Sequence, residues 1–138
     1  MQLAGVWENE HGSIMEITVE DGLIEGLYSS HTGETGTYRV VGLADPEPGD
    51  GSQTFAFVIC WRPLDSQAVE SGGHGVSAFV GQLQMIDEEE TLTTMWLLTK
   101  PTPPEENWAS ILVDKSIFKR QDTNFLELCR RLRICVML

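Results

Sequence analysis

The sequence lacks the marks of a membrane-spanning or disulfide-bonded protein. Its longest apolar run, FAFVICW at residues 55–61, is far too short to span a bilayer. Cysteines occur three times, an odd number that closes no disulfide framework, and Cys60 is expected in the core or at an interface. The N-terminal MQLAGVW has neither the basic nor the apolar region of a signal peptide. These absences favour a cytoplasmic protein, or a secreted one if a leader precedes the chain.

Positive charge is also scarce. The 138 residues carry 9 Lys and Arg against 21 Asp and Glu, a formal net charge of −12. Nucleic acid and anionic membrane surfaces repel such a protein, so neither is expected as a partner. Residues 119–138 are the exception, since their five basic and two acidic side chains give +3. We expect residues 1–118 to form one domain and 119–138 to form an extension. The extension either docks on another subunit or is partly disordered.

Helical periodicity and catalytic motifs are missing as well. No helical period appears before residue 123, and FLELCRRLRICVML after Thr123 fits a short helix or an added strand. The sequence has no Gly-rich phosphate loop, nucleophile elbow or Cys/His pair. The three histidines, His11, His31 and His74, match no metal-ligand spacing. We therefore expect neither an enzyme nor a cofactor.

Short strands separated by turn residues dominate the chain. SIMEITVE at 13–20 alternates apolar and polar side chains, as a half-buried strand does. Further strands are predicted at 6–9, 23–30, 37–45, 55–61, 76–86, 91–99 and 108–118, and DEEE at 87–90 is expected to be a solvated turn. Eight consecutive strands predict an all-β fold, an eight-stranded antiparallel up-and-down β-barrel. The mouth of such a barrel can hold one small ligand.

Strand parity places polar groups on the face that carries the aromatic residues. In GVWENEHGS at 5–13, Trp7 and Asn9 share a face. The same alternation turns one amide and several hydroxyls inward, those of Asn9, Ser13, Tyr28, Ser30, Ser77 and Ser116. These groups could bond to one another or to buried water. Six of them in phase with the aromatics favour a ligand instead, because small-molecule sites combine apolar walls with a few placed polar groups.

Six segments resemble, in order, segments of the avidin–streptavidin family, over about residues 5–118. They are GVWENEHGS, GLYSSHTG, FVICW, VSAFVGQ, TMWLLT and WASILVDKSIF. The pattern G-x-W-x-N-x-x-G-S and the Trp-Leu-Leu-Thr strand are the most specific parts of the match. The family fold is an eight-stranded antiparallel barrel, and its ligand is biotin. The resemblance therefore implies non-catalytic, high-affinity biotin binding in the open end of a barrel, with biotin sequestration as the suggested role.

The resemblance also implies which residues bind the ureido group of biotin. Asn9, Ser13 and Tyr28 match the three donors to the ureido oxygen, and Ser30 matches the acceptor from one ureido N–H. Ser116 stands where the family commonly has Asp or Asn, which accepts from the second N–H. Losing a hydrogen bond to a charged group costs roughly 1.5–3 kcal/mol, which is about 10–150-fold in affinity.

The walls of the site are carried over in the same way. Trp61, Phe79 and Trp96 match the aromatic walls around the bicyclic ring, with Leu98 in the same wall. Ser77 matches the hydroxyl near the thioether sulfur.

The tail of the ligand is expected to meet less favourable groups. Gly33 and Glu34 lie in the loop whose backbone N–H groups meet the valerate carboxylate, but Glu34 adds negative charge. Gly75 replaces a serine that often bonds this carboxylate. His11 replaces an apolar residue, and is either a loop histidine or a ligand contact. Asp114, two residues before Ser116 on the same face, is a further candidate.

Assembly can also be inferred from the resemblance. Trp108 matches the tryptophan that reaches into a neighbouring subunit's site in tetrameric members. The loop 62–75 is about five residues longer than in streptavidin and holds no cysteine for the disulfide of dimeric members. A homotetramer is therefore favoured, with a dimer or a higher oligomer as the alternative. The alternative function is an avidin-like barrel with weakened biotin binding, with another small ligand, or with its site filled by the C-terminal extension.

Overall fold

The computed structural model describes residues 1–30, 36–64 and 74–121, and eight β-strands account for most of them. The strands are β1 Gly5–Asn9, β2 Ile14–Glu20, β3 Leu23–Ser30, β4 Gly36–Ala44, β5 Ser52–Cys60, β6 Val76–Ile86, β7 Glu89–Thr99 and β8 Ile111–Arg120. A short 3₁₀ helix, η1 Pro104–Ala109, precedes β8. The segment after Thr123, which fits a helix or a strand by sequence, lies outside the described residues.

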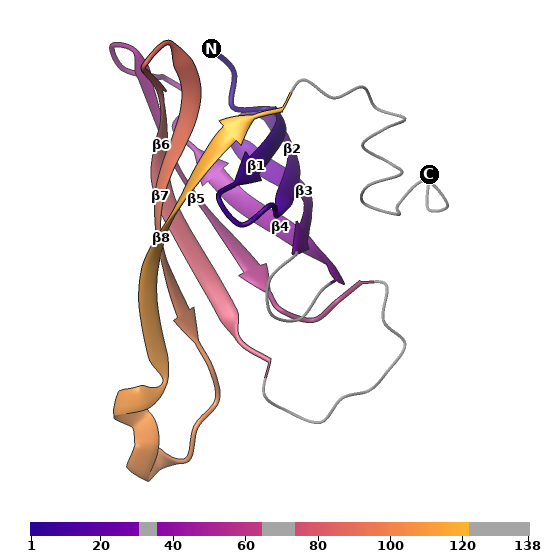
Figure 1. Ribbon diagram of the computed structural model, residues 1–138, viewed down its shortest axis with the longest axis vertical. Helices are drawn as coiled ribbons and strands as arrows, with labels where there is room; N and C mark the ends of the chain where they lie inside the picture. The colour runs from indigo at the N-terminus through magenta and orange to yellow at the C-terminus, as the bar shows by residue number, and fades with distance from the viewer. Residues whose placement is uncertain (31–35, 65–73, 122–138) are drawn as a thin grey trace.

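The strands form one closed barrel (Figure 1). Each strand pairs antiparallel with the next, and β8 returns to β1 through the pairs Trp7–Arg120 and Asn9–Phe118. Closure leaves no unpaired strand edge. The predicted eight-stranded antiparallel up-and-down barrel is confirmed.

Two tight turns explain where neighbouring strands begin. Asp21 and Gly22 have φ of 49° and 80°, and Asp87 and Glu88 have φ of 50° and 65°. Positive φ at both central residues gives a hairpin turn whose twist matches the flanking strands. The second turn is shorter than the predicted one at 87–90, because Glu89 and Glu90 already belong to β7.

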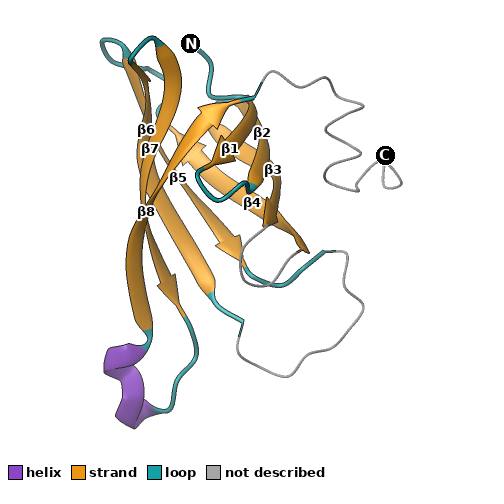
Figure 2. Ribbon diagram, viewed as in Figure 1, coloured by secondary structure: helices purple, strands orange, loops and turns teal. Residues whose placement is uncertain are grey.

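The start of β8 differs from the prediction. Trp108 lies in η1 (purple in Figure 2), and β8 begins at Ile111 and continues to Arg120. A proline in the first turn of η1 explains this, since its fixed φ suits a helical start. The predicted strand 108–118 is therefore wrong in its first three residues and two residues short at its end.

One end of the barrel is filled by apolar side chains, and we call it the closed end. The fully buried residues there include Trp7, Ile24, Leu83, Leu92 and Phe118. The Trp7 indole N–H donates to the carbonyl of Leu3 at 2.9 Å, which satisfies its only polar group. A ligand cavity lies toward the opposite, open end, where β1, β3, β5 and β7 terminate.

Arg120 joins the two chain ends of the barrel at the closed end. Its guanidinium lies 4.3 Å from the centroid of the Trp7 ring, bonds Glu90 Oε2 at 2.5 Å and donates to the carbonyl of Ala4 at 2.9 Å. Gly5 has φ of +139°, and a Cβ at this position would lie 2.4 Å from the Arg120 Nη1 atom. The φ of Gly5 is one that other residues rarely adopt, which favours glycine here, and its lack of a side chain leaves room for the Arg120 guanidinium.

The outer wall of the barrel changes character around its circumference. One continuous register row, which we call the outer row, contains Thr18, Glu25, Val41, Val58, Ala78, Leu97 and Val113, on β2 to β8. Its first members are polar, whereas Val58, Leu97 and Val113 are apolar and exposed. Cys60 is exposed beside this row, so a core position for it is wrong. None of the described helices has the length and apolar character needed to cross a bilayer.

Candidate ligand-binding site

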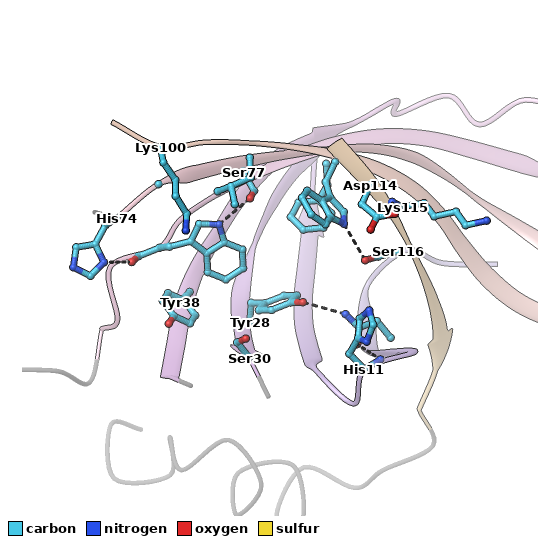
Figure 3. A pocket seen from close by; sticks show the side chains of 16 residues that line it. His11, Tyr28, Ser30, Tyr38, His74, Ser77, Lys100, Asp114, Lys115 and Ser116 are labelled. Carbon is cyan, nitrogen blue, oxygen red and sulfur yellow. Dashed lines mark hydrogen bonds between the residues drawn. The ribbon is translucent and has the colours of Figure 1, made fainter. Parts of the chain in front are cut away.

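A cavity of about 470 Å³ opens at the end of the barrel opposite Trp7 (Figure 3). This volume falls in the range of about 300–1,000 Å³ that is usual for small-molecule sites. Its walls come from the last residues of β1, β3 and β7, the first residues of β4 and β6, the middle of β8 and residues next to the strand ends. They include Asn9, Tyr28, Ser30, Tyr38, Trp61, Ser77, Phe79, Trp96, Leu98 and Ser116.

The Asn9 side chain has a fixed orientation. Its Oδ1 accepts backbone N–H groups from His11 and Ser13, both at 3.0 Å, in the β1–β2 turn. Exchanging the two ends of the amide would place its NH₂ against two donors, so Nδ2 must point the other way. Nδ2 donates to the Tyr28 hydroxyl at 3.1 Å. Asn9 therefore presents a donor to the cavity and uses its acceptor to hold the turn.

Tyr28 receives hydrogen bonds at its phenol oxygen. Asn9 donates to it, and the Ser13 side chain bonds to it as well. Burial raises the pKa of Tyr28 above its ordinary value, although the hydrogen bonds from Ser13 and Asn9 act in the opposite direction. The phenol is thus neutral at physiological pH and keeps its own proton to donate. Two donors, from Asn9 and Tyr28, converge at this side of the cavity.

Two indole N–H groups are bonded to two serine hydroxyls in the cavity wall. Trp61 Nε1 donates to Ser77 Oγ at 2.8 Å, and Trp96 Nε1 donates to Ser116 Oγ at 3.2 Å. A hydroxyl oxygen that accepts one hydrogen bond still has a second lone pair and its own proton. Both serines can therefore bond the protein and a ligand together.

Aromatic rings complete the walls. Trp61 meets Tyr28 and Tyr38 edge to face, with ring centroids 5.6 Å and 4.8 Å apart, and Phe79 lies 6.4 Å from Trp96. These contacts hold the rings in place and leave flat apolar surface toward the cavity. No buried side-chain nitrogen or oxygen in the described ranges is without a hydrogen-bond partner. The hydrogen bonds within the protein therefore satisfy these buried groups, and their burial alone does not demand a ligand.

The thirteen residues singled out by resemblance fall into three groups. Nine line the cavity, namely Asn9, Tyr28, Ser30, Trp61, Ser77, Phe79, Trp96, Leu98 and Ser116. Ser13 is fully buried behind Tyr28, and Trp108 is 85% exposed on η1, away from this cavity. Gly33 and Glu34 lie outside the described residues. The predicted inward position of all six polar residues is confirmed, since each is at most 8% exposed.

Several lining residues were not expected from the sequence, or were expected only as alternatives. Tyr38, Lys100 and Lys115 line the cavity without having been singled out. Tyr38 shares strand parity with buried Val40, which could have placed it inside. His11 and Asp114, considered above as possible contacts, also line the cavity, as do His74 and Gly75.

A family comparison agrees with this architecture. The model of the Avidin family matches residues 1–121, from the first residue to the end of the described chain. The chain belongs to the avidin family. Avidin-family proteins are non-catalytic binding proteins, which agrees with a site built from hydrogen-bond donors, serines and aromatic walls. The match ends one residue after β8 of this avidin-family barrel, so it covers every strand described here.

Proposed function

We propose that this avidin-family barrel binds biotin with high affinity and without catalysis, and that it sequesters biotin. The observation that carries the proposal is the orientation of Asn9. Its acceptor is occupied by two backbone N–H groups, and one N–H of Nδ2 donates to Tyr28, so the second N–H and the Tyr28 hydroxyl proton can both donate to a ligand in the cavity. A carbonyl-type oxygen is the ligand group that such a pair recognises.

The ureido group of biotin fits this end of the cavity. Its oxygen would accept from Asn9 and Tyr28, with Ser13 supporting Tyr28 from behind or donating directly. Its two N–H groups would donate to Ser30 and Ser116. Several donors on one oxygen draw the ureido group toward a charge-separated form, so each hydrogen bond is partly charge-assisted.

The rest of biotin would contact the walls. Trp61, Phe79, Trp96 and Leu98 would enclose the bicyclic ring, and the Ser77 hydroxyl would lie near the thioether sulfur. Trp61 already donates to Ser77, which leaves the serine proton for the sulfur. Gly33 and Glu34, outside the described residues, remain the proposed loop contacts of the valerate carboxylate.

Ser116 sets the expected strength of binding. It lacks the reach and charge of a carboxylate, and its oxygen already accepts from Trp96. As the alternative function, we propose that the barrel binds biotin more weakly than members with Asp or Asn at the position of Ser116. In that case the site could instead hold another small ligand or residues 119–138.

Calorimetric titration of the purified full chain with biotin tests the function. A dissociation constant in the nanomolar range or below is expected. A constant weaker than micromolar would contradict the proposal. Desthiobiotin serves as the matched ligand, because it keeps the ureido group and carboxylate and lacks the sulfur near Ser77.

We also propose that the barrel self-associates, as a homotetramer built from dimers. The apolar half of the outer row, Val58, Ala78, Leu97 and Val113, is flanked on the same wall by Val80, Met95 and Ile111, all more than half exposed. A contiguous apolar patch of this kind marks a protein interface. A second copy offers the same patch and fits a two-fold contact. Trp108, 85% exposed beyond the open end, is available to a neighbouring subunit's cavity.

Light scattering tests the assembly. The intact chain is expected to have a multiple of the subunit mass, and Leu97→Lys is expected to reduce it. Thr18→Lys, on the polar half of the same outer row, is the matched control and should change nothing. A monomeric intact chain would contradict the proposal, and an unchanged mass after truncation at Gln121 would exclude a role of the extension.

A further inference from the structure

Lys100 lies at the rim of the cavity, and the carboxylate of a ligand tail is the group it fits. Along β7, Thr94, Trp96 and Leu98 face inward, and Lys100 continues the same alternation one residue beyond the strand. Thr94 pairs with Ser116, at the level of the proposed ureido contacts. Six residues of extended chain span about 20 Å, so Lys100 is anchored far toward the mouth, and its long side chain reaches back.

Figure 3 shows the Lys100 side chain pointing into the cavity on the side where His74 lies, away from His11 and Ser116. A ligand whose polar head meets Asn9 and Tyr28 can extend toward this side of the cavity. Lys100 would then face the part of the ligand that the donors at the deep end do not touch.

Gly75 makes room for this lysine. A Cβ built at residue 75 would lie 3.1 Å from Lys100 Cγ and only 2.4 Å from the backbone oxygen of Thr99. A serine at this position would crowd the stem of Lys100 and the neighbouring strand. Glycine at residue 75 therefore leaves space for the stem of Lys100 and contributes no side-chain donor of its own at this rim.

The charges of the chain and of the cavity wall bear on the role of Lys100. The chain carries a net charge of −12, which repels an anion that approaches the barrel. Among the described lining residues, Lys100 and Lys115 are cationic and Asp114 is anionic, and Asp114 Oδ1 accepts the backbone N–H of Lys115 at 2.7 Å. Lys100 forms no ion pair with any carboxylate of the described ranges, so its ammonium is available to a ligand.

We propose that Lys100 determines specificity for a ligand with an anionic tail, so that the site prefers free biotin over biotin whose carboxyl group is esterified or amidated. The inference rests on the proposed biotin binding and adds to it a choice between two forms of the ligand. Lys100 is exposed, and an exposed ion pair contributes up to about 1 kcal/mol, which corresponds to about fivefold in affinity.

Displacement calorimetry with biotin and biotin methyl ester tests the inference. Lys100→Met keeps the length of the side chain and removes the charge. It is expected to weaken biotin about fivefold at low salt and to leave the ester unchanged, so that the preference for the free acid disappears. Added salt should reduce the same preference in the unmodified protein. Arg39→Gln, which removes one positive charge on the exposed face of β4, is the matched control and should affect neither ligand.

The outcomes separate the two proposals. If both ligands bind the unmodified protein equally, or if Lys100→Met weakens both alike, the role of Lys100 is wrong and biotin binding stands. If neither ligand binds the unmodified protein, the proposed function is wrong, and the inference falls with it.

Discussion

The two ends of this barrel use the same strands for opposite purposes. At the closed end, side chains such as Trp7, Leu92 and Phe118 are fully buried and fill the interior. At the open end, inward residues of the same strands are an amide, hydroxyls and buried or partly buried aromatics around a cavity of about 470 Å³. Apolar burial, and the stability that comes with it, is therefore concentrated at the closed end, whereas the open end carries polar groups.

Removing a tryptophan from each end should give the largest contrast. Trp7→Ala is expected to lower the free energy of unfolding by about 3–5 kcal/mol, because it empties a closely packed site and orphans the Leu3 carbonyl. Trp61→Ala, in the cavity wall, should cost markedly less stability and weaken biotin at least tenfold. Urea denaturation and calorimetry measure the two effects. Equal losses of stability would remove the distinction between the ends.

Asn9 tests the open end directly. Asn9→Ala is expected to lower biotin affinity at least tenfold while the barrel stays folded, as circular dichroism would report. Asn9→Asp keeps an acceptor for the His11 and Ser13 N–H groups and loses the donor toward Tyr28. It should therefore preserve the turn and still lose affinity. An unchanged affinity in both variants would make Asn9 a purely structural amide.

Ser116 should respond in the other direction. Ser116→Asp is expected to raise biotin affinity by about tenfold or more, since a charged acceptor strengthens the hydrogen bond from a ureido N–H. Ser116→Ala, which removes the acceptor, should lower it. Dissociation rates of biotin measure both. A weaker complex with Ser116→Asp would mean that the cost of burying the carboxylate exceeds its gain.

Arg120 tests the closed end without touching the cavity. Arg120→Met is expected to lower the free energy of unfolding by about 1–3 kcal/mol, because it removes hydrogen bonds to Glu90 and to the carbonyl of Ala4. Lys119→Met, which loses an exposed ion pair with Glu89 and a hydrogen bond to the Thr91 hydroxyl, should cost about 1 kcal/mol, less than Arg120→Met. Biotin affinity should not change in either variant, and a change would show that the ends are coupled.

Alkaline pH should give the smallest effect. The folded-state pKa of Tyr28 lies above its ordinary value, so the unfolded chain loses this proton first as the pH rises. The contribution of Tyr28 to stability is complete below about pH 10 and is lost as the pH rises through the folded-state pKa. Tyr28→Phe should show a weaker loss of stability above pH 10. Parallel stability curves for both proteins would contradict this assignment.

Much of the barrel could be predicted because alternation of side chains is a local signal. Trp7, Asn9, Tyr28 and Ser77 all face inward as their parity requires. The same alternation places Cys60 on the outer face, because its neighbours Ile59 and Trp61 both face inward, and Cys60 is exposed. Its apolar surroundings in the sequence were a poorer guide than its parity.

The rim of the site could not be predicted in this way. Lys100 and Gly75 lie just outside the strands. Parity gives the side of the chain on which Lys100 lies, but beyond the last paired residue it does not fix where so long a side chain ends. The start of β8 could not be predicted either. Trp108 precedes the apolar run of β8 in the sequence, but it lies in the 3₁₀ helix η1. The loop with Gly33 and Glu34 lies outside the described residues.

The pairing of β1 with β8 also constrains how the chain acquires its fold. Trp7 and Arg120 lie 113 positions apart, yet their strands must meet before the barrel is closed. All other strand pairs join neighbours in the sequence and can form progressively as hairpins. Closure therefore carries most of the loop entropy of folding and should be its slow step. During synthesis on the ribosome, the edge of β1 that does not pair with β2 must stay unpaired until β8 has emerged.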